Sequence, residues 1–388
     1  MLTKLLPILG ITFVDILGFS MLIPMLPYFA THFGASPETV GLLFATFSLC
    51  QLGAGPLWGA LSDRIGRKRV LIVSQAGATV GWAMLAFAPS LAWVFIARIV
   101  EGISGGNIGV TQAYVADLVE AKDRARAFGY IGAAFGAAMI FGPLGGGLLF
   151  ARYGFTAPFL AASALQLLTL LLTITLLPES LGQRGDEADV GVRTVLATFG
   201  KRHLRPILLE KLALSLALYG WFAVIALYLR AQLGMTLEGT DLFFSLFAAS
   251  NVIVNTLLVG RISHRLGDRV MTNLGLVALL SSFLLVPLVH ADAMLVLIAM
   301  LFTVGMALAN NGITARISNA SSDREQGTVL GVSSSLDSLS GVLAPPLSTG
   351  LLGSFGAGYA GIASAAFSAV ALGIGVMSAP TDAKQSTR

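Results

Sequence analysis

Twelve long apolar runs, separated by short polar segments, constrain this chain more than any other feature. They lie at about 5–28, 39–61, 70–88, 91–116, 128–150, 157–177, 207–229, 242–262, 270–290, 293–315, 327–350 and 358–378. Each run is close to the roughly 20 residues that a helix needs to cross the hydrocarbon core of a bilayer. The pattern predicts an all-α polytopic membrane protein with twelve transmembrane helices, and 388 residues leave no room for a large domain outside the bilayer.

Composition argues against the soluble classes of protein. Charged residues make up 11% of the chain, whereas a soluble domain carries about 25%. The net charge of +4 would suggest a nucleic-acid partner in a soluble protein, but here it follows from the loops, so we expect none. One cysteine, Cys50, allows no internal disulfide. No pair of histidines has ligand spacing and no phosphate-binding loop is present, so we expect no metal, no ATP and no bound cofactor.

The lysines and arginines predict the orientation of the chain. Twelve spans place both termini on one side of the membrane, and the connections on that side hold all but four of the 24 cations. Arg152 and Arg230 lie on the other side, whereas Arg98 and Lys211 fall within or at the end of a span. Because cytoplasmic loops are enriched in Lys and Arg, we expect both termini in the cytoplasm.

The longest connection, 178–206, divides the chain into two halves. Its high content of charged residues predicts a cytoplasmic linker. Its second part carries the apolar face of an interfacial helix, and a solvated linker explains the same pattern equally well. The predicted organisation is an N-terminal six-helix bundle at 1–177, the linker, a C-terminal six-helix bundle at 207–378 and a cytoplasmic tail at 379–388.

The two halves resemble each other in sequence. The segment 59–66 recurs, degraded, as 260–267, the pair Asp123-Arg124 recurs as Asp323-Arg324, and Pro143 recurs as Pro345. Three matches at nearly one offset, in the same topological places, indicate an internal repeat. Parallel repeats of this kind usually enclose a transport pathway at their interface.

The sequence GALSDRIGRKR at 59–69 follows the second apolar run. Its two glycines permit a tight turn between helices, and its cations hold the loop in the cytoplasm. The segment resembles the loop motif of the major facilitator superfamily, and the resemblance covers essentially the whole chain. It implies two pseudo-symmetric six-helix bundles that work as a monomer and bind a small-molecule substrate within the lipid bilayer.

The resemblance also implies how the loop acts as a gate. Asp63 is expected to contact the start of the eleventh span, and Arg67 is expected to pair with an acid that ends the fourth span, a place that Asp117 occupies. The residues to which this implies a gating role are Gly59, Asp63, Arg64, Gly66, Arg67 and Asp117. For Lys68 and Arg69, anchoring of the topology is a sufficient explanation.

The fifth span contains the sequence GPLGG at 142–146. Its glycines allow a neighbouring helix to approach closely, and Pro143 removes one backbone hydrogen bond. The order of Gly142, Pro143, Gly145 and Gly146 resembles the motif of the antiporter branch of the superfamily, although ordinary packing of small residues explains glycines in a span as well. This motif favours exchange of substrate against a coupling ion.

Charges inside the spans are few, and each is costly to insert, by about 2.5–3.5 kcal/mol at a helix centre. The candidates for proton coupling are Asp15, Arg98, Glu101 and Asp337. Arg98 and Glu101 lie three residues apart and can neutralise each other, so a structural ion pair is the alternative to a functional one. Asp337 stands among serines at 333, 334, 335, 338 and 340, whose hydroxyls are expected to offset its charge.

Asp15 begins a pattern with Gly18, Pro24 and Pro27 that is similar to the first span of tetracycline efflux proteins. The resemblance implies a coupling or substrate-binding carboxylate, and a helix-packing role is the alternative. The similarity ends where those proteins carry an acid in span three, because Gly81 stands there, and the acid of span nine is also missing. We therefore do not expect a tetracycline–magnesium chelate as the cargo, whereas proton-coupled antiport remains the expectation.

Neutral polar and aromatic residues of the spans are candidates for a surface that binds a lipophilic compound. They are Trp82, Asn107, Gln112, Tyr219, Trp221, Phe222, Asn251, Asn255, Asn310 and Asn311. A ladder of hydrogen bonds between helices is the alternative for Asn251 and Asn255, and lipid-facing packing is the alternative for the two tryptophans.

Together the patterns and the resemblance imply a secondary transporter in the cytoplasmic (inner) membrane of a bacterium. It is expected to export a small drug-like compound in exchange for protons by alternating access, as in multidrug efflux and antibiotic resistance. A symporter or uniporter for a metabolite is the competing interpretation within the superfamily. An enzyme is disfavoured because no nucleophile or metal cluster is visible, and a channel is disfavoured because no filter or charged ring is visible.

Overall fold

The computed structural model describes residues 2–105, 108–119, 124–180, 192–289, 292–321 and 325–378, and all regular elements there are helical. The elements up to the linker are α1 (Leu2–His32), α2 (Pro37–Ile65), α3 (Arg67–Ala86), α4 (Leu91–Ser104), α5 (Ile108–Leu118), α6 (Arg124–Tyr153) and α7 (Thr156–Leu176). The later elements are α8 (Val192–Gly200), α9 (Arg205–Leu233), α10 (Leu237–Val254), the π-helix η3 (Asn255–Val259), α11 (Gly260–Leu266), α12 (Asp268–Leu285), the 3₁₀ turn η4 (Val286–Leu288), α13 (Asp292–Ala320), α14 (Gln326–Phe355), the 3₁₀ turn η5 (Ala357–Tyr359) and α15 (Ile362–Met377).

Eleven of the described helical segments are long and apolar enough to cross a membrane. They coincide with eleven of the twelve predicted runs, and α4 and α5 together occupy the fourth run. The remaining run, 327–350, forms the 30-residue helix α14, which is less apolar because it carries Asp337 and several serines. The prediction of an all-α polytopic membrane protein is confirmed.

The chain forms two compact units. The first comprises Met1–Asp186 and Ile225–Ala249, and the second comprises Glu187–Val224 and Ser250–Arg388. The end of α9 and most of α10 therefore belong with the first unit. In the predicted linker, 181–191 lie outside the described residues and 192–200 form the short helix α8. The role of an interfacial helix stays a prediction.

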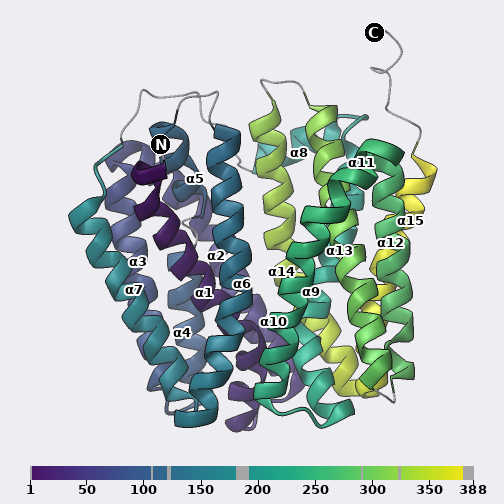
Figure 1. The fold of residues 1–388 in the computed structure, drawn as a ribbon, viewed down its shortest axis with the longest axis horizontal. Coiled ribbons are helices and arrows are strands. Elements are labelled where there is room, and N and C mark those ends of the chain that lie inside the picture. The colour runs from purple at the N-terminus through teal and green to yellow at the C-terminus, as the bar shows by residue number, and fades with distance from the viewer. Residues whose placement is uncertain are drawn as a thin grey trace. The chain divides into compact units, whose positions relative to one another are not determined.

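In the first unit, α1 packs against α6 and α7, and α3 packs against α4 and α7 (Figure 1). Glycine makes the contact between α1 and α6 possible, because a Cβ at Gly142 would lie 2.7 Å from the carbonyl oxygen of Leu17. Near the loop between α2 and α3, at what is called below the loop end of this unit, Tyr114 and Val115 of α5 pack with Val70 and Leu71 of α3 in a buried cluster. This cluster holds α5 beside the loop between α2 and α3.

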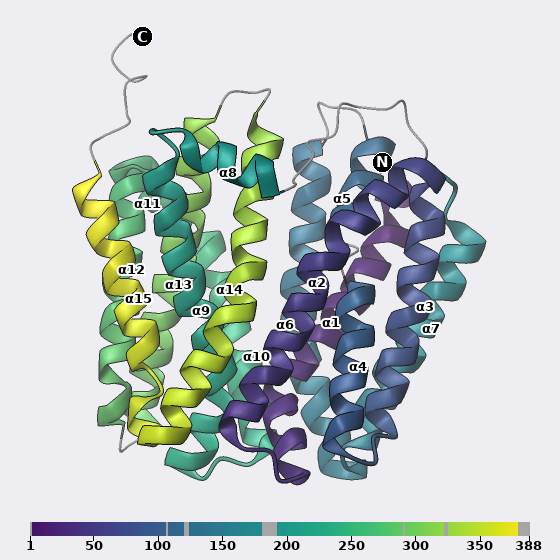
Figure 2. The same cartoon turned by 180° about the vertical axis from the view of Figure 1, so that it is seen from behind.

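In the second unit, α12 packs between α13 and α15 (Figure 2). A Cβ at Gly305 of α13 would lie 2.8 Å from the carbonyl oxygen of Gly275 in α12, so the backbones of these helices are in contact. Trp221 of α9 packs on the rings of Phe283 and Phe302, with centroid distances of 5.4 and 6.2 Å. Close backbone approach at small residues is the packing mode expected in lipid.

The internal repeat is visible in equivalent contacts. Lys68 Nζ donates to the carbonyl oxygen of Ile174 at 2.8 Å, and Arg269 Nη2 donates to that of Gly375 at 3.0 Å. Both the donors (68 and 269) and the acceptors (174 and 375) are 201 residues apart in sequence. In each case a cation at the start of one helix satisfies a free carbonyl at the end of another, which completes the last turn of α7 and of α15.

Candidate functional site

The loop between α2 and α3 turns at Gly66, whose φ of 107° lies in the region that favours glycine. Its N–H donates to the carbonyl oxygen of Ser62 at 3.0 Å and so ends α2. A Cβ at this position would also collide with the carboxylate of Glu179. Conformation and crowding therefore both require glycine here.

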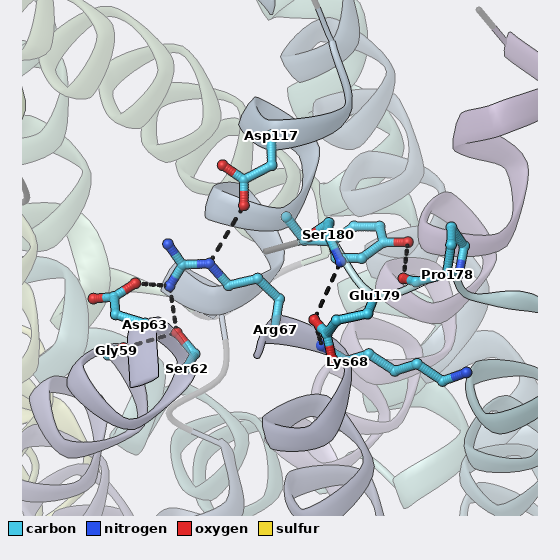
Figure 3. A network of polar contacts seen from close by, with 10 residues as sticks. Gly59, Ser62, Asp63, Arg67, Lys68, Asp117, Pro178, Glu179 and Ser180 are labelled. Carbon is cyan, nitrogen blue, oxygen red and sulfur yellow. Dashed lines mark hydrogen bonds and ion pairs between the residues drawn. The ribbon is translucent and has the colours of Figure 1, made fainter. Parts of the chain in front are cut away.

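Arg67 is the centre of the loop site (Figure 3). Its guanidinium contacts Asp63 and donates to Ser62 Oγ at 2.5 Å. The distance between Arg67 Nε and Asp117 Oδ2 is 3.4 Å. Ser62 Oγ in turn donates to the carbonyl oxygen of Gly59 at 2.7 Å. The pairing of Arg67 with Asp117 that the resemblance implied is therefore present. Arg64 is exposed at the end of α2. The contact of Asp63 with the eleventh span stays a prediction.

Glu179 is a second anchor of this loop that sequence reasoning missed. Its Oε1 accepts hydrogen bonds from the backbone N–H of Lys68 and of Ser180, both at 3.1 Å (Figure 3). Next to it, the hydroxyl of Tyr114 donates to the carbonyl oxygen of Pro178 at 3.0 Å. A carboxylate at the N-terminus of α3 satisfies an otherwise free N–H and interacts favourably with the helix dipole.

Arg98 and Glu101 form a buried ion pair within α4, with side chains that are 2% and 5% exposed. The guanidinium of Arg98 also lies over the ring of Phe47 of α2, 4.2 Å from its centroid. Arg98 Nε and Glu101 Oε1 have no hydrogen-bond partner among the described residues. A pair buried this deeply, with one donor and one acceptor unused, is costly to keep in an apolar helix.

Gly81 of α3 makes room for this pair. A Cβ at Gly81 would lie 2.6 Å from Glu101 Cγ, so the Glu101 side chain fills the volume that a side chain at 81 would need. The third span has no acid at this position, and the side chain of Glu101 in the fourth span lies beside it instead. A similar contact holds Ser104 Oγ against Gly77 one turn away.

Asp15 lies half-buried on α1 and accepts a hydrogen bond from Gln166 of α7, with 2.7 Å between Nε2 and Oδ1. The two residues are 151 positions apart, so no local pattern announces the contact. Gln166 itself is 2% exposed. The hydrogen bond from this amide fixes the orientation of the Asp15 carboxyl group. An amide N–H can donate to the ionised or to the protonated form, so this contact does not set the charge of Asp15.

The glycines of the GPLGG segment differ in their surroundings. Gly142 packs on Ser20 and Leu17 of α1, and a Cβ at Gly146 would meet the side chain of Met21. Nothing lies within 4 Å of a Cβ at Gly145. Pro143 stands inside α6, which continues to Tyr153. One face of the motif is thus the surface on which α6 packs against the helix that carries Asp15.

For three of the five serines that were expected to offset the charge of Asp337, the expectation is wrong. Ser335, Ser338 and Ser340 donate to carbonyl oxygens one turn earlier in their own helix, and Asp337 is held from α9 instead. Lys211 Nζ lies 2.8 Å from Asp337 Oδ1, and Ser215 Oγ donates to the same oxygen at 2.5 Å. In helices, serine hydroxyls readily bond to the carbonyl four residues back, and a nearby ammonium group stabilises a carboxylate more strongly.

Four of the predicted binding residues are asparagines that lie on α10, η3 and α13. Asn311 Nδ2 donates to Asn255 Oδ1 at 2.8 Å, and Asn255 Nδ2 donates to Asn251 Oδ1 at 2.9 Å. Asn310 Oδ1 accepts from Lys211 Nζ at 3.2 Å. Three of them therefore form the hydrogen-bond ladder named as the alternative, at the point where α10 gives way to a π-helix, an irregularity that is frequent at functional sites.

The two tryptophans among the predicted binding residues are buried. Trp82 is 7% exposed and Trp221 is 3% exposed, so lipid-facing packing is wrong for both. Trp82 packs on Gly18 of α1 and stacks on Phe159 at 6.4 Å. Tyr219 is exposed on α9 and Gln112 is exposed on α5, whereas Asn107 lies outside the described residues.

Two further buried acids were missed. Glu210 of α9 is fully buried and pairs with Arg316 Nη1 at 2.8 Å. Asp241 of α10 is 1% exposed, and neither of its carboxylate oxygens has a hydrogen-bond partner among the described residues. The sequence placed Glu210 and Asp241 at the ends of spans, where charges are ordinary, so nothing marked them as buried.

Repeated helices that are long and apolar enough to cross a membrane, with rare ion pairs inside them, are typical of membrane transporters. The chain matches the family model of the Major Facilitator Superfamily over residues 8–319 and 212–388, and it belongs to that family. It is therefore an integral membrane protein and a transporter of small molecules rather than an enzyme.

Relatives with known names fit this class. The tetracycline resistance protein, class C, of Escherichia coli is 30% identical over 378 residues, which are 92% of each chain. Multidrug resistance protein 2 of Bacillus subtilis (strain 168) is 28% identical over 346 residues, 86% of this chain and 85% of the relative.

Solved structures share the fold. A bacterial homologue of the human lysosomal transporter Spinster, in an inward-facing and unoccupied conformation, has a TM-score of 0.83 at 16% identity and covers 96% of this chain and 95% of its own. The human organic anion transporter MFSD10 has a TM-score of 0.73 at 22% identity, over 96% of this chain and 98% of its own.

Proposed function

We propose that this protein exports a small lipophilic compound in exchange for protons, by alternating access, across the cytoplasmic membrane of a bacterium. The names of the relatives, which confer resistance to tetracycline and to multiple drugs, support the class of substrate. The placement of lysine and arginine supports an orientation with both termini in the cytoplasm.

The buried pair of Arg98 and Glu101 is the observation that carries the proposal of proton coupling. Uptake of a proton by Glu101 would leave Arg98 with an uncompensated buried charge, so protonation and the packing of α2, α3 and α4 around the pair are linked. Such linkage between a proton and helix packing is what a proton-driven conformational cycle needs.

Asp15 extends the same argument to α1. It is held by α7, and its helix packs directly on the glycine face of α6. A carboxylate on a helix that contacts the antiporter motif can respond when that contact changes. In the proposed cycle Asp15 binds proton or substrate, Arg98 and Glu101 modulate it, and Asp63, Arg67 and Asp117 stabilise closure at the loop end.

Proteoliposomes test the proposal. With an imposed inward proton gradient, efflux of a panel of lipophilic drugs that includes tetracycline is expected to dissipate the gradient. Asp15→Asn is expected to abolish this coupling, and Glu38→Gln, which changes an exposed acid in the first turn of α2, is the matched control. Drug movement in both directions without a gradient would indicate a uniporter, and movement of drug together with protons would indicate a symporter. Either result would reject antiport.

A further inference from the structure

The carboxylate of Asp241 lies deep inside the first unit, at the start of α10. Its side chain is 1% exposed, and both oxygens lack a hydrogen-bond partner among the described residues. An ionised carboxylate without partners in an apolar interior costs several kcal/mol or more, and such groups bind a proton instead.

The place of Asp241 is set by α6. A Cβ at Gly147, directly after the GPLGG segment, would lie 2.8 Å from both Cβ and Oδ2 of Asp241. The absence of a side chain at 147 is what lets α10 bury its carboxylate against the backbone of α6. The burial of Asp241 therefore depends on the contact between α6 and α10 at Gly147.

Among the described residues, the charged or titratable groups near Asp241 do not neutralise it. Glu238 lies one turn earlier on α10 and is an acid, so it offers no positive charge to pair with Asp241. From α1, the hydroxyl of Tyr28 contacts Thr240 Oγ1 at 2.8 Å and donates to the carbonyl oxygen of Met235 at 2.9 Å. From α9, the guanidinium of Arg230 lies over the Tyr28 ring at 5.3 Å and donates to Thr31, so it is engaged away from the carboxylate.

We propose that Asp241 is a proton-binding site whose protonation closes α10 onto α6 at Gly147, at the end of the helices opposite the loop site. This inference rests on the proposed function, because an exporter driven by protons must take up the coupling proton from the outer side. Separation of α10 from Gly147 would hydrate the carboxylate and let it exchange protons with the outer solution, and closure would bury the proton that it has bound. Low pH therefore favours the closed packing and high pH favours separation.

Distance measurements between spin labels on the full-length protein in nanodiscs test this. Leu148 of α6 and Leu242 of α10 are 66% and 50% exposed and can carry labels as cysteines in a Cys50→Ser background. Between about pH 5.5 and about pH 8, the ratio of long to short distances is expected to rise by up to tenfold per pH unit, the limit for one linked proton.

Asp241→Asn is the decisive variant, since it keeps the shape and removes the titration. It is expected to keep the short distance at every pH, whereas Glu238→Gln, the matched control on the same helix, is expected to respond as the unmodified protein does. Gly147→Ala is expected to raise the long-distance fraction already at low pH. A pH response that survives in Asp241→Asn, or its absence in the unmodified protein, overturns the inference.

These outcomes are separable from failure of the proposed function. Drug efflux in proteoliposomes that dissipates the proton gradient, together with a pH response unchanged in Asp241→Asn, would overturn the role of Asp241 and leave antiport standing. A pH response that is lost in Asp241→Asn, in a protein that moves drug without protons, would support the proton site and overturn antiport.

Discussion

Lys211 and Asp337 join α9 to α14 through an ion pair of 2.8 Å in which the lysine is 7% exposed and the aspartate 33% exposed. Asn310 of α13 accepts a second hydrogen bond from the same ammonium group, so three helices of the second unit meet at one cation. A charge that is otherwise costly in a span is in this way shared among neighbours.

Removal of the lysine tests how much this junction contributes. Lys211→Met leaves the Asp337 carboxylate without its cation and is expected to lower the free energy of unfolding in detergent by about 1–3 kcal/mol, between the values for exposed and for buried pairs. The double variant Lys211→Met, Asp337→Asn removes both charges and is expected to recover most of the loss. If the double variant is as unstable as the single one, the pair does not hold the helices together.

The Arg98–Glu101 pair gives a sharper version of the same experiment because both side chains are buried. Glu101→Gln strands the arginine charge and is expected to cost about 3–5 kcal/mol in unfolding free energy. The double variant Arg98→Met, Glu101→Met fills similar volume without charge and is expected to be nearly as stable as the unmodified protein. Its transport activity then separates the two roles that the sequence left open, since a purely structural pair predicts activity in the double variant and a coupling pair predicts none.

The spans could be predicted from sequence because each is an apolar run long enough to cross the bilayer. The repeat could be predicted because similar segments recur at an offset of about 201 residues. Side-chain partners could not be predicted in the same way. The Gln166 amide that holds Asp15 comes from a helix 151 residues away, and Lys211 looked like an ordinary cation at the end of a span. The contact of Arg67 with Asp117 was found in advance only through the family resemblance, which supplied a spatial relationship that spacing alone does not contain.

Burial was the other property that the sequence did not reveal. Asp241 lies at the start of an apolar run, where a carboxylate usually meets water, and its burial depends on the missing side chain at Gly147 of another helix. The serines around Asp337 misled for a related reason, since their hydroxyls are used within α14. Local composition indicates which groups a residue is able to bond to, whereas the fold determines which groups lie within bonding distance.

Within the GPLGG segment, two neighbouring glycines are expected to respond differently to the same change. A Cβ at Gly142 would press on the Leu17 backbone of α1, so Gly142→Ala is expected to cost about 1–3 kcal/mol as overpacking. Gly145→Ala meets nothing within 4 Å and is expected to be neutral or to stabilise α6 slightly, as alanine favours helices over glycine by about 1 kcal/mol. Thermal unfolding in detergent and drug efflux measure both. Equal loss in the two variants would show that flexibility of the segment, and not its packing on α1, is what the glycines provide.

The two cations that complete helix ends in the repeat are expected to differ in strength. Lys68 bonds to one carbonyl at the end of α7, whereas Arg269 reaches the carbonyl oxygens of Gly375, Val376 and Ser378 at the end of α15. A cation at a helix C-terminus contributes about 0.3–1 kcal/mol in exposed places and up to about 2 kcal/mol where it is partly buried.

Arg269→Ala is therefore expected to lower the unfolding free energy more than Lys68→Ala does, by a difference of about 1 kcal/mol. Arg265→Ala changes an exposed cation at the end of α11 and controls for the loss of positive charge at the same surface. Denaturant unfolding of the three variants in one detergent gives the comparison. If Arg265→Ala and Arg269→Ala lose the same stability, general electrostatics rather than completion of the α15 end explains the effect, and the equivalence with Lys68 is geometric only.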